Sequence, residues 1–200
     1  IGAGWQINEH KAYGIELESQ GKRVTRFEEA IQIIRSLLDN ERTNFDGSVY
    51  TITDATADPK PVQPRLPLLV GTASPRMLRI AARHADEWNT WGAPEMAAER
   101  RALLTAACEA VGRQPDSMHT SVQALVYLTD SPELIERVRT GPMAPRALAG
   151  PADELIEAVA RYAELGFDEF NVHTMSLGAT PAERIERLEQ FDAEVVAHFR

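Results

Sequence analysis

Cysteine is almost missing from this sequence, because Cys108 is the only one among 200 residues. A single cysteine excludes an internal disulfide and any metal site built from several thiolates. It suits a reducing compartment, so we expect a cytoplasmic protein. Long apolar runs are missing too: the best stretch, Leu66 to Val70, contains Pro67 and falls far short of the ~18 apolar residues of a membrane span. The first residues show no signal-peptide pattern.

Positive charge is scarce relative to negative charge. The sequence has 21 Lys and Arg residues against 30 Asp and Glu residues, which gives a formal net charge of −9. An acidic chain without a basic cluster is not expected to bind nucleic acid or an anionic membrane surface. The composition is otherwise typical of a globular protein, with 44% hydrophobic and 26% charged residues, and the length suits one domain over residues 1–200.

Motifs of several common enzyme classes are also absent. There is no Walker sequence, no HExxH and no GxSxG, and the five histidines lack metal-ligand spacing, so we predict no bound metal. His173 is the most interesting histidine because it ends a predicted strand, and the active sites of α/β barrels gather at the carboxyl ends of strands. A structural or solvated histidine fits this position equally well.

What the sequence does contain is an alternation of short apolar strands and amphipathic helices. The predicted strands lie near residues 66–70, 87–91, 119–128 and 168–173. The predicted helices cover residues 25–39, 75–84, 94–112, 151–165 and 181–200, with a short helix starting at Pro132. Thr25 and Glu28 have the spacing of a capping box, as do Thr180 and Glu183. Residues 43–50 read as a hairpin with its turn at Asp46-Gly47, and residues 141–150 read as a Pro-rich loop.

This alternation predicts an α/β fold. We expect the four strands to be parallel, adjacent in chain order, and covered by helices on the outer face. A doubly wound sheet and a (β/α)8 barrel both satisfy the pattern, but a barrel typically needs ~250 residues and eight strands. The chain also begins at Ile1 without a methionine. We therefore expect part of something larger, whose open sheet edges need a covering partner.

The segment from Gly71 to Arg76 is the most informative motif. It follows a buried strand and opens a helix, so small residues and free backbone amides are placed where an anion can approach. The hydroxyls of Thr72 and Ser74 can donate hydrogen bonds, and Arg76 adds positive charge. A phosphate site and an ordinary strand-to-helix loop both fit this pattern. Gly2-Ala3-Gly4 is a weaker signal for a ligand loop, because it has no third glycine.

Several segments, taken in order, resemble the luciferase-like family of flavin and deazaflavin oxidoreductases. The resemblance covers nearly the whole chain, and it is specific through the order and spacing of its pieces. The segments that carry it are Gly2 to His10, Arg26 to Ala30, Phe45 to Tyr50, Pro59 to Gln63, Leu68 to Gly71, Ala81 to Asn89 and Glu164 to Phe170. The most similar branch is the actinobacterial type that is expected to use the deazaflavin coenzyme F-420.

The resemblance implies a luciferase-like (β/α)8 barrel, of which this chain supplies roughly the C-terminal half to two-thirds. It implies a flavin-type cofactor at the carboxyl ends of the strands. The implied cofactor contacts are Gly2, Ala3, Gly4 and Asn8 along the ring, and Gly71, Thr72, Ala73 and Ser74 at the phosphate, to which the residue pattern adds Arg76. The family's substrate-side acid or histidine lies on its first strands, so the catalytic residues are not identified. Trp5 stands where the sugar-phosphate dehydrogenase branch has a glutamate, which argues against that substrate class.

Three functions follow as hypotheses. The first is hydride transfer between F-420 and a small organic substrate, and F-420 is favoured because one nearby cation matches the monoanionic phosphodiester of that cofactor. The second is an FMN-dependent monooxygenase of the same family. The third is a non-catalytic fragment. An open barrel also predicts association, either with a missing N-terminal segment or with another copy of the chain.

Overall fold

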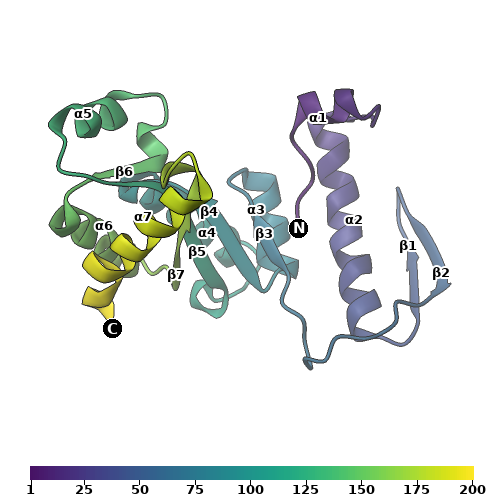
Figure 1. Ribbon diagram of the computed structural model, residues 1–200. Helices are drawn as coiled ribbons and strands as arrows, with labels where there is room; N and C mark the ends of the chain where they lie inside the picture. The colour runs from purple at the N-terminus through teal and green to yellow at the C-terminus, as the bar shows by residue number, and fades with distance from the viewer.

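A parallel sheet of five strands forms the centre of the computed structural model, which describes residues 1–200 (Figure 1). Four strands follow one another across the sheet, and the third of them also pairs with the last strand of the chain. All pairings in this sheet are parallel, which confirms the predicted order of the four strands. The strands are β3 (Leu69–Gly71), β4 (Glu87–Trp91), β5 (His119–Leu128), β6 (Ala147–Gly150) and β7 (Glu169–His173).

Two strands differ from the prediction. β3 begins at Leu69 and not at residue 66, because Pro67 has no amide and the carbonyl of Leu68 already accepts the N–H groups of Asp86 and Glu87. β6 lies inside the segment that was predicted to be a loop. It pairs with residues 125–128 at the end of β5, whereas β7 pairs with residues 121–125.

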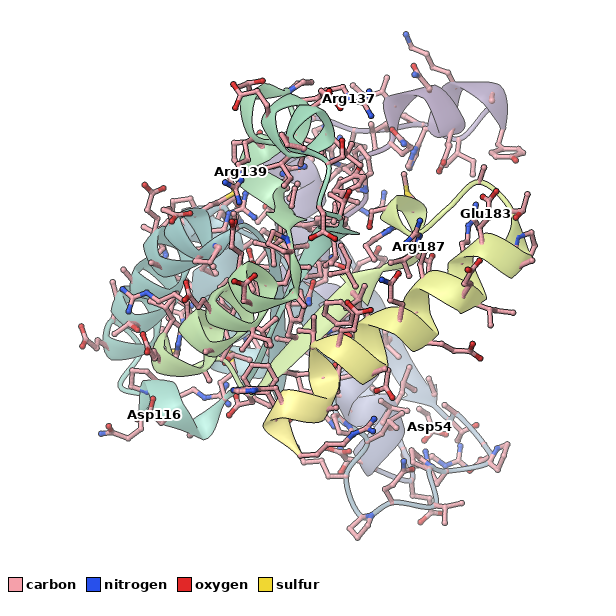
Figure 2. All side chains as sticks on the ribbon, turned by 60° about the vertical axis from the view of Figure 1, so that its left-hand side comes forward. Asp54, Asp116, Arg137, Arg139, Glu183 and Arg187 are labelled. Carbon is pink, nitrogen blue, oxygen red and sulfur yellow. The ribbon has the colours of Figure 1, made fainter.

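Helices cover one face of this sheet. Along β4, Trp88 and Thr90 are buried, while Glu87, Asn89 and Trp91 are only half-buried on the opposite, inner face. The outer helices are α3 (Pro75–His84), α4 (Pro94–Glu109), α5 (Pro132–Thr140), α6 (Ala152–Glu164) and α7 (Pro181–Glu194), with short 3-10 turns at Pro115–Ser117, Ala144–Arg146, Thr174–Ser176 and Val196–Phe199. Charged side chains lie at the periphery, as Asp116, Arg137 and Glu183 show (Figure 2).

The N-terminal third forms α1 (Ile7–Ala12), α2 (Gln20–Asp39) and an antiparallel hairpin of β1 (Thr43–Asp46) and β2 (Thr51–Ala55). In Figure 1, α2 stands between this hairpin and the parallel sheet. α1 was not predicted, and the second hairpin strand starts after the predicted hairpin ends. The capping box at Thr25 is wrong, because α2 already begins at Gln20 and the Thr25 hydroxyl donates to the Gly21 carbonyl oxygen, 3.2 Å away.

Other helix boundaries agree with the sequence. The capping box of Thr180 and Glu183 is present at the start of α7, and the Ser131 hydroxyl accepts from the Leu134 N–H at the start of α5. Gly166 ends the α6 segment with a φ of +81°, a conformation that favours glycine. α7 ends at Glu194, before the predicted end of the last helix. No helix is both long and apolar enough to cross a membrane.

Two carboxylates hold α2 in place. Glu29 accepts hydrogen bonds from the Ser48 hydroxyl and from three consecutive backbone N–H groups, those of residues 48–50 in the hairpin turn. A side chain at Gly47 would overlap the Glu29 carboxylate, so this turn requires glycine for space.

Near the C-terminal end of α2, the Asp86 carboxylate accepts hydrogen bonds from Arg35, from Arg65 Nε at 2.8 Å and from the Leu68 N–H at 2.8 Å. Burial works to raise the pKa of Asp86, but these bonds outweigh it and hold the pKa below its usual value.

Candidate functional site

The loop between β3 and α3 leaves hydrogen-bond donors without partners. Ser74 occupies the N-cap position of α3, and Pro75 is the first helical residue. The Ser74 hydroxyl makes no capping bond to the helix. The first bond of the helix runs from the Leu78 N–H to the Ser74 carbonyl, so the amides of Arg76 and Met77 have no acceptor within the helix. These amides and the hydroxyl are available to a ligand.

A buried tryptophan fixes the position of this loop. The Trp88 Nε1–H donates to the Thr72 carbonyl oxygen at 2.8 Å, and the Thr72 N–H donates to the Asn89 carbonyl at 3.3 Å. The Ser74 N–H in turn donates to the Thr72 hydroxyl at 3.3 Å. Trp88 is completely buried, so the loop is attached to the rigid core of the sheet.

A cavity of about 230 Å³ brings the two predicted loops together. The Ile1 nitrogen donates to the Leu69 carbonyl oxygen at 2.6 Å and holds the N-terminal segment beside β3. The cavity is lined by Gly2, Ala3, Gly4 and Trp5 from the first segment, by Gln20, Arg23 and Val24 from α2, and by Gly71, Thr72, Ser74 and Met77. The N-terminal turns of α2 and α3 therefore meet at one cavity, an arrangement that favours an anion.

The positively charged side chain that lines this cavity is that of Arg23, whereas the sequence pointed to Arg76. Arg76 donates to the Gly21 carbonyl at 3.2 Å and to the Thr25 hydroxyl at 3.0 Å, and it does not line the cavity. Arg23 lines it instead, with one guanidinium nitrogen on the Glu18 carbonyl at 3.0 Å. Arg23 was not predicted as a site residue because the capping pattern at Thr25 placed it before the helix. The apolar face of this helix extends back to Val24. Starting the predicted helix before Val24 would have placed Arg23 in its first turns.

Two further predicted contact residues lie outside the cavity lining. Asn8 lies on α1, where it is exposed. Ala73 lies within the β3–α3 loop, but it is not among the lining residues. Six of the nine predicted residues thus share one cavity, and Asn8, Ala73 and Arg76 do not.

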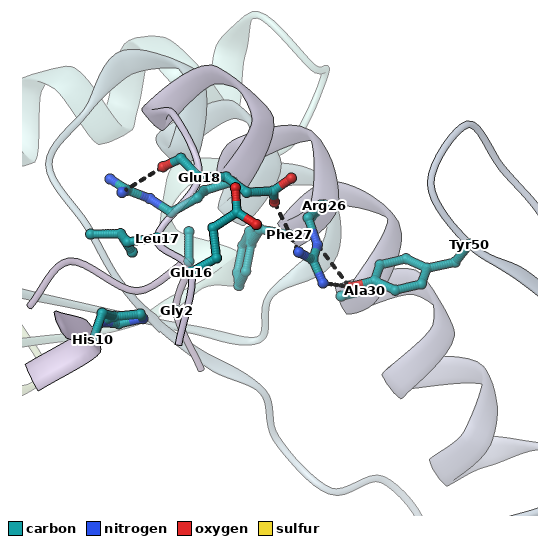
Figure 3. A pocket seen from close by; sticks show the side chains of 11 residues that line it. Gly2, His10, Glu16, Leu17, Glu18, Arg26, Phe27, Ala30 and Tyr50 are labelled. Atoms are coloured by element: carbon teal, nitrogen blue, oxygen red, sulfur yellow. Dashed lines mark hydrogen bonds and ion pairs between the residues drawn. The ribbon is translucent and has the colours of Figure 1, made fainter. Parts of the chain in front are cut away.

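A second cavity of about 230 Å³ adjoins the first, with Gly2, Ala3 and Arg23 in both linings (Figure 3). Arg26 crosses it, with one guanidinium nitrogen 2.8 Å from a Glu18 carboxylate oxygen and two others 3.1 and 3.2 Å from the Tyr50 hydroxyl. The bond from Arg26 lowers the pKa of Glu18. Arg26 on α2 thus contacts the segment that precedes α2 through an ion pair and the hairpin turn through hydrogen bonds. These contacts engage Arg26, which leaves Arg23 as the cation on the first cavity.

A family comparison identifies the class of this protein. The family model of the luciferase-like monooxygenases matches residues 1–144, so the chain belongs to that family. An F-420-dependent glucose-6-phosphate dehydrogenase of Microbacterium testaceum is 28% identical, and the match covers 86% of this chain and 61% of the relative. The chain thus spans about three-fifths of the length of this curated relative.

Solved structures share the fold. An F-420-dependent secondary alcohol dehydrogenase, in complex with an F-420–acetone adduct, has a TM-score of 0.70 at 20% identity, with 86% of this chain and 62% of that chain covered. The monooxygenase RslO1 from Streptomyces bottropensis has a TM-score of 0.74 at 21% identity, with 100% and 68% covered. The predicted fold is confirmed: the chain forms part of a luciferase-like barrel.

Proposed function

We propose that the protein is an oxidoreductase that transfers a hydride between bound coenzyme F-420 and a small organic substrate. The observation that carries this proposal is the cavity in which the Gly2–Gly4 and Gly71–Ser74 loops meet beneath two helix N-termini. Two similar proteins support the cofactor, since the glucose-6-phosphate dehydrogenase relative and the secondary alcohol dehydrogenase are both F-420-dependent.

The residues at the cavity fit the phosphodiester of F-420. The amides of Arg76 and Met77 and the Ser74 hydroxyl are unused donors, and Arg23 is the cation in the lining. A side chain at Gly2 or Gly71 would meet no atom within 4 Å, so both positions leave room for a group to approach the backbone. One cation with backbone amides matches a monoanionic diester better than the nearly dianionic phosphate of FMN.

The protein's own residues position the cofactor and do not perform the redox step. Trp88 fixes the phosphate loop on the sheet, Arg23 and Ser74 bind the anion, and the Gly2–Gly4 segment forms the opposite wall. F-420, when bound, supplies a carbon hydride donor or acceptor and no oxygen adduct. The chemistry therefore favours reduction or dehydrogenation over oxygenation. The wholly buried Cys108 suits the reducing cytoplasm that we propose as its location.

The half-exposed inner face of the sheet leads us to propose self-association or association with a further segment. Leu69 is 38% exposed on this face and Trp91 is half-buried. Sedimentation at micromolar concentration tests this association. A stable, well-folded monomer of 22.2 kDa would contradict it.

Cofactor titration tests the proposed function. The full chain is titrated with F-420 and with FMN at matched ionic strength, and the absorbance or fluorescence of each cofactor reports binding. We expect F-420 to bind more tightly. If FMN bound at least tenfold more tightly, a preference of ~1.4 kcal/mol, the monooxygenase alternative would replace this proposal. If neither cofactor bound, an independent redox function of this chain would be refuted.

A further inference from the structure

The inner face of the sheet carries a group of neutral polar side chains at its carboxyl end. Side chains alternate along a strand, and Trp88 and Thr90 are buried under the helices, so Asn89 and Trp91 point to the inner face. In the parallel register, Trp91 lies beside Gln123 of β5, and Leu125 lies beside His173 of β7.

The rings of Trp91 and His173 meet on this face. Their centroids are 5.0 Å apart with an interplanar angle of 37°, although β5 lies between their two strands. Both side chains must therefore lie over β5, on the same side of the sheet. This contact joins two strand ends that are far apart in the sequence and defines one wall at the carboxyl end of the barrel interior.

An amide network supports the floor beside that wall. The Asn89 side-chain amide donates to the Ser121 hydroxyl at 2.8 Å, and the Gln123 amide donates to the Asn89 side-chain oxygen at 3.1 Å. Asn89 therefore uses both ends of its side chain within the protein. The side-chain oxygen of Gln123 accepts no hydrogen bond and is available as an acceptor.

His173 presents a fixed donor. The Met175 N–H donates to His173 Nδ1 at 3.2 Å, so a neutral imidazole carries its proton on Nε2. The Ser176 hydroxyl donates to the His173 carbonyl at 2.9 Å and accepts from the Val126 N–H at 2.9 Å, which locks this turn onto β5. The Nε2–H group makes no hydrogen bond within the protein and can donate to a ligand.

The inner-face strand positions at this end carry no charged side chain, and the nearby Arg100 guanidinium donates to the Trp91 carbonyl and to Thr90, whose side chain faces the helices. The inner positions of β4, β5 and β7 hold Glu87, His119 and Glu169 at the opposite, amino end of the strands, and none holds Lys or Arg. A phosphorylated substrate bound between Trp91 and His173 would meet no Lys or Arg side chain from these strand positions to offset the loss of hydration.

We propose that Trp91 and His173 form the substrate wall and select an uncharged carbonyl compound or the corresponding alcohol. His173 Nε2–H donates a hydrogen bond to the substrate oxygen, and the Trp91 indole packs against its apolar part. This inference rests on the proposed function and adds the substrate class to it. His173 is a binding and positioning residue in this scheme. The substrate oxygen takes its proton from water when the carbonyl is reduced and gives it to water when the alcohol is oxidised.

Binding of two matched aromatic probes to the full chain tests the proposal without turnover. Acetophenone is a neutral ketone and phenyl phosphate is an anion with the same ring, and each is added while the three tryptophan indole N–H signals are followed by NMR. Trp91→Phe identifies the Trp91 signal by its disappearance. We expect acetophenone to move this signal and phenyl phosphate to leave it unchanged.

Variants at two histidines make the test specific. His173→Phe keeps an aromatic ring but removes the donor, so we expect about fivefold weaker acetophenone binding. His173→Gln restores a donor and recovers part of this loss. His119→Phe changes a histidine at the other end of the sheet and leaves acetophenone binding unchanged. An equal response to phenyl phosphate, or unchanged acetophenone binding by His173→Phe, overturns the inference.

The cofactor titration separates this result from the proposed function. If acetophenone moved the Trp91 signal but F-420 did not bind, the substrate wall would stand and the cofactor assignment would fail. If F-420 bound but acetophenone did not move the Trp91 signal, the cofactor assignment would stand and the substrate wall would be refuted.

Discussion

The indole N–H of Trp88 donates a hydrogen bond of 2.8 Å to the carbonyl oxygen of Thr72. This bond joins a buried residue of one strand to the loop that ends the neighbouring strand. It explains why the Gly71–Ser74 loop is held open beneath the helix N-terminus, since Thr72 is attached to the core by its own backbone. The shape of the candidate phosphate site therefore depends on a residue that does not line it.

Trp88→Phe should disturb the loop more than it disturbs the core. Phenylalanine leaves the Thr72 carbonyl without its partner, so we expect a loss of ~1–3 kcal/mol in the free energy of unfolding together with weaker F-420 binding. Urea denaturation and cofactor titration measure the two effects. Phe167→Leu is the matched control, because Phe167 stacks on Trp88 with ring centroids 6.0 Å apart but does not bond to the loop. Equal losses of cofactor binding in both variants would show that Trp88 acts only through packing.

The sequence predicted the strand order because each of the four strands is a short segment, either apolar or with apolar and polar residues in alternation, between turn residues and helices. β6 was not predicted because Ala147–Gly150 has no side-chain alternation, and its strand conformation comes from pairing with the carboxyl-terminal end of β5. The strand propensity of these four residues alone cannot show that they pair with a distant strand.

The sequence predicted which two loops lie together, because both are marked by small residues that leave the backbone accessible. Gly2–Gly4 and Gly71–Ser74 are recognised by small residues beside a strand and a helix start, and the structure brings them to one cavity. The cation was assigned to Arg76 because it follows the loop in sequence. Only the packing of α2 against α3 shows that Arg76 bonds to α2 and that Arg23 lines the cavity.

Ser74→Ala should weaken cofactor binding with little change in stability. The Ser74 hydroxyl makes no capping bond, so its removal leaves the helix end as it was. If the hydroxyl donates to the phosphate, F-420 binding should weaken by about 5- to 30-fold, or ~1–2 kcal/mol. Thermal unfolding without cofactor and F-420 titration are measured on the same preparation. A loss of stability with unchanged affinity would reverse this assignment and make Ser74 a structural cap.

Arg23→Gln and Arg76→Gln should have different effects on F-420 binding. Glutamine at position 23 removes the positive charge from the cavity, so we expect roughly tenfold weaker binding at low salt, with the difference shrinking as salt is added. Arg76→Gln breaks the contacts with Gly21 and Thr25, and it should leave F-420 affinity close to that of the wild type. A large, salt-dependent loss in Arg76→Gln would restore the assignment that the sequence suggested.

Glu29 should make the hairpin sensitive to acid. The Ser48 hydroxyl and the backbone N–H groups of residues 48–50 bond to its carboxylate, and they lower its pKa from 4.5 to about 2. Because the folded-state pKa lies below that of the unfolded chain, the stabilising contribution is complete above about pH 4.5 and is lost as the pH falls toward about 2. Glu29→Gln should therefore be less stable than the wild type at pH 7, and the difference should shrink through this window.

Two measurements check the role of Glu29. Urea denaturation between pH 7 and the acid limit gives the stability difference at each pH, and amide hydrogen exchange at residues 48–50 reports the turn itself. Exchange at these amides should be faster in Glu29→Gln, because a neutral amide cannot accept all of their bonds and its own donors face them. Glu41→Gln, at an exposed position after α2, should match the wild type throughout. A stability difference between Glu29→Gln and the wild type that stayed constant from pH 7 down to about pH 2 would mean that the carboxylate charge does not hold the turn.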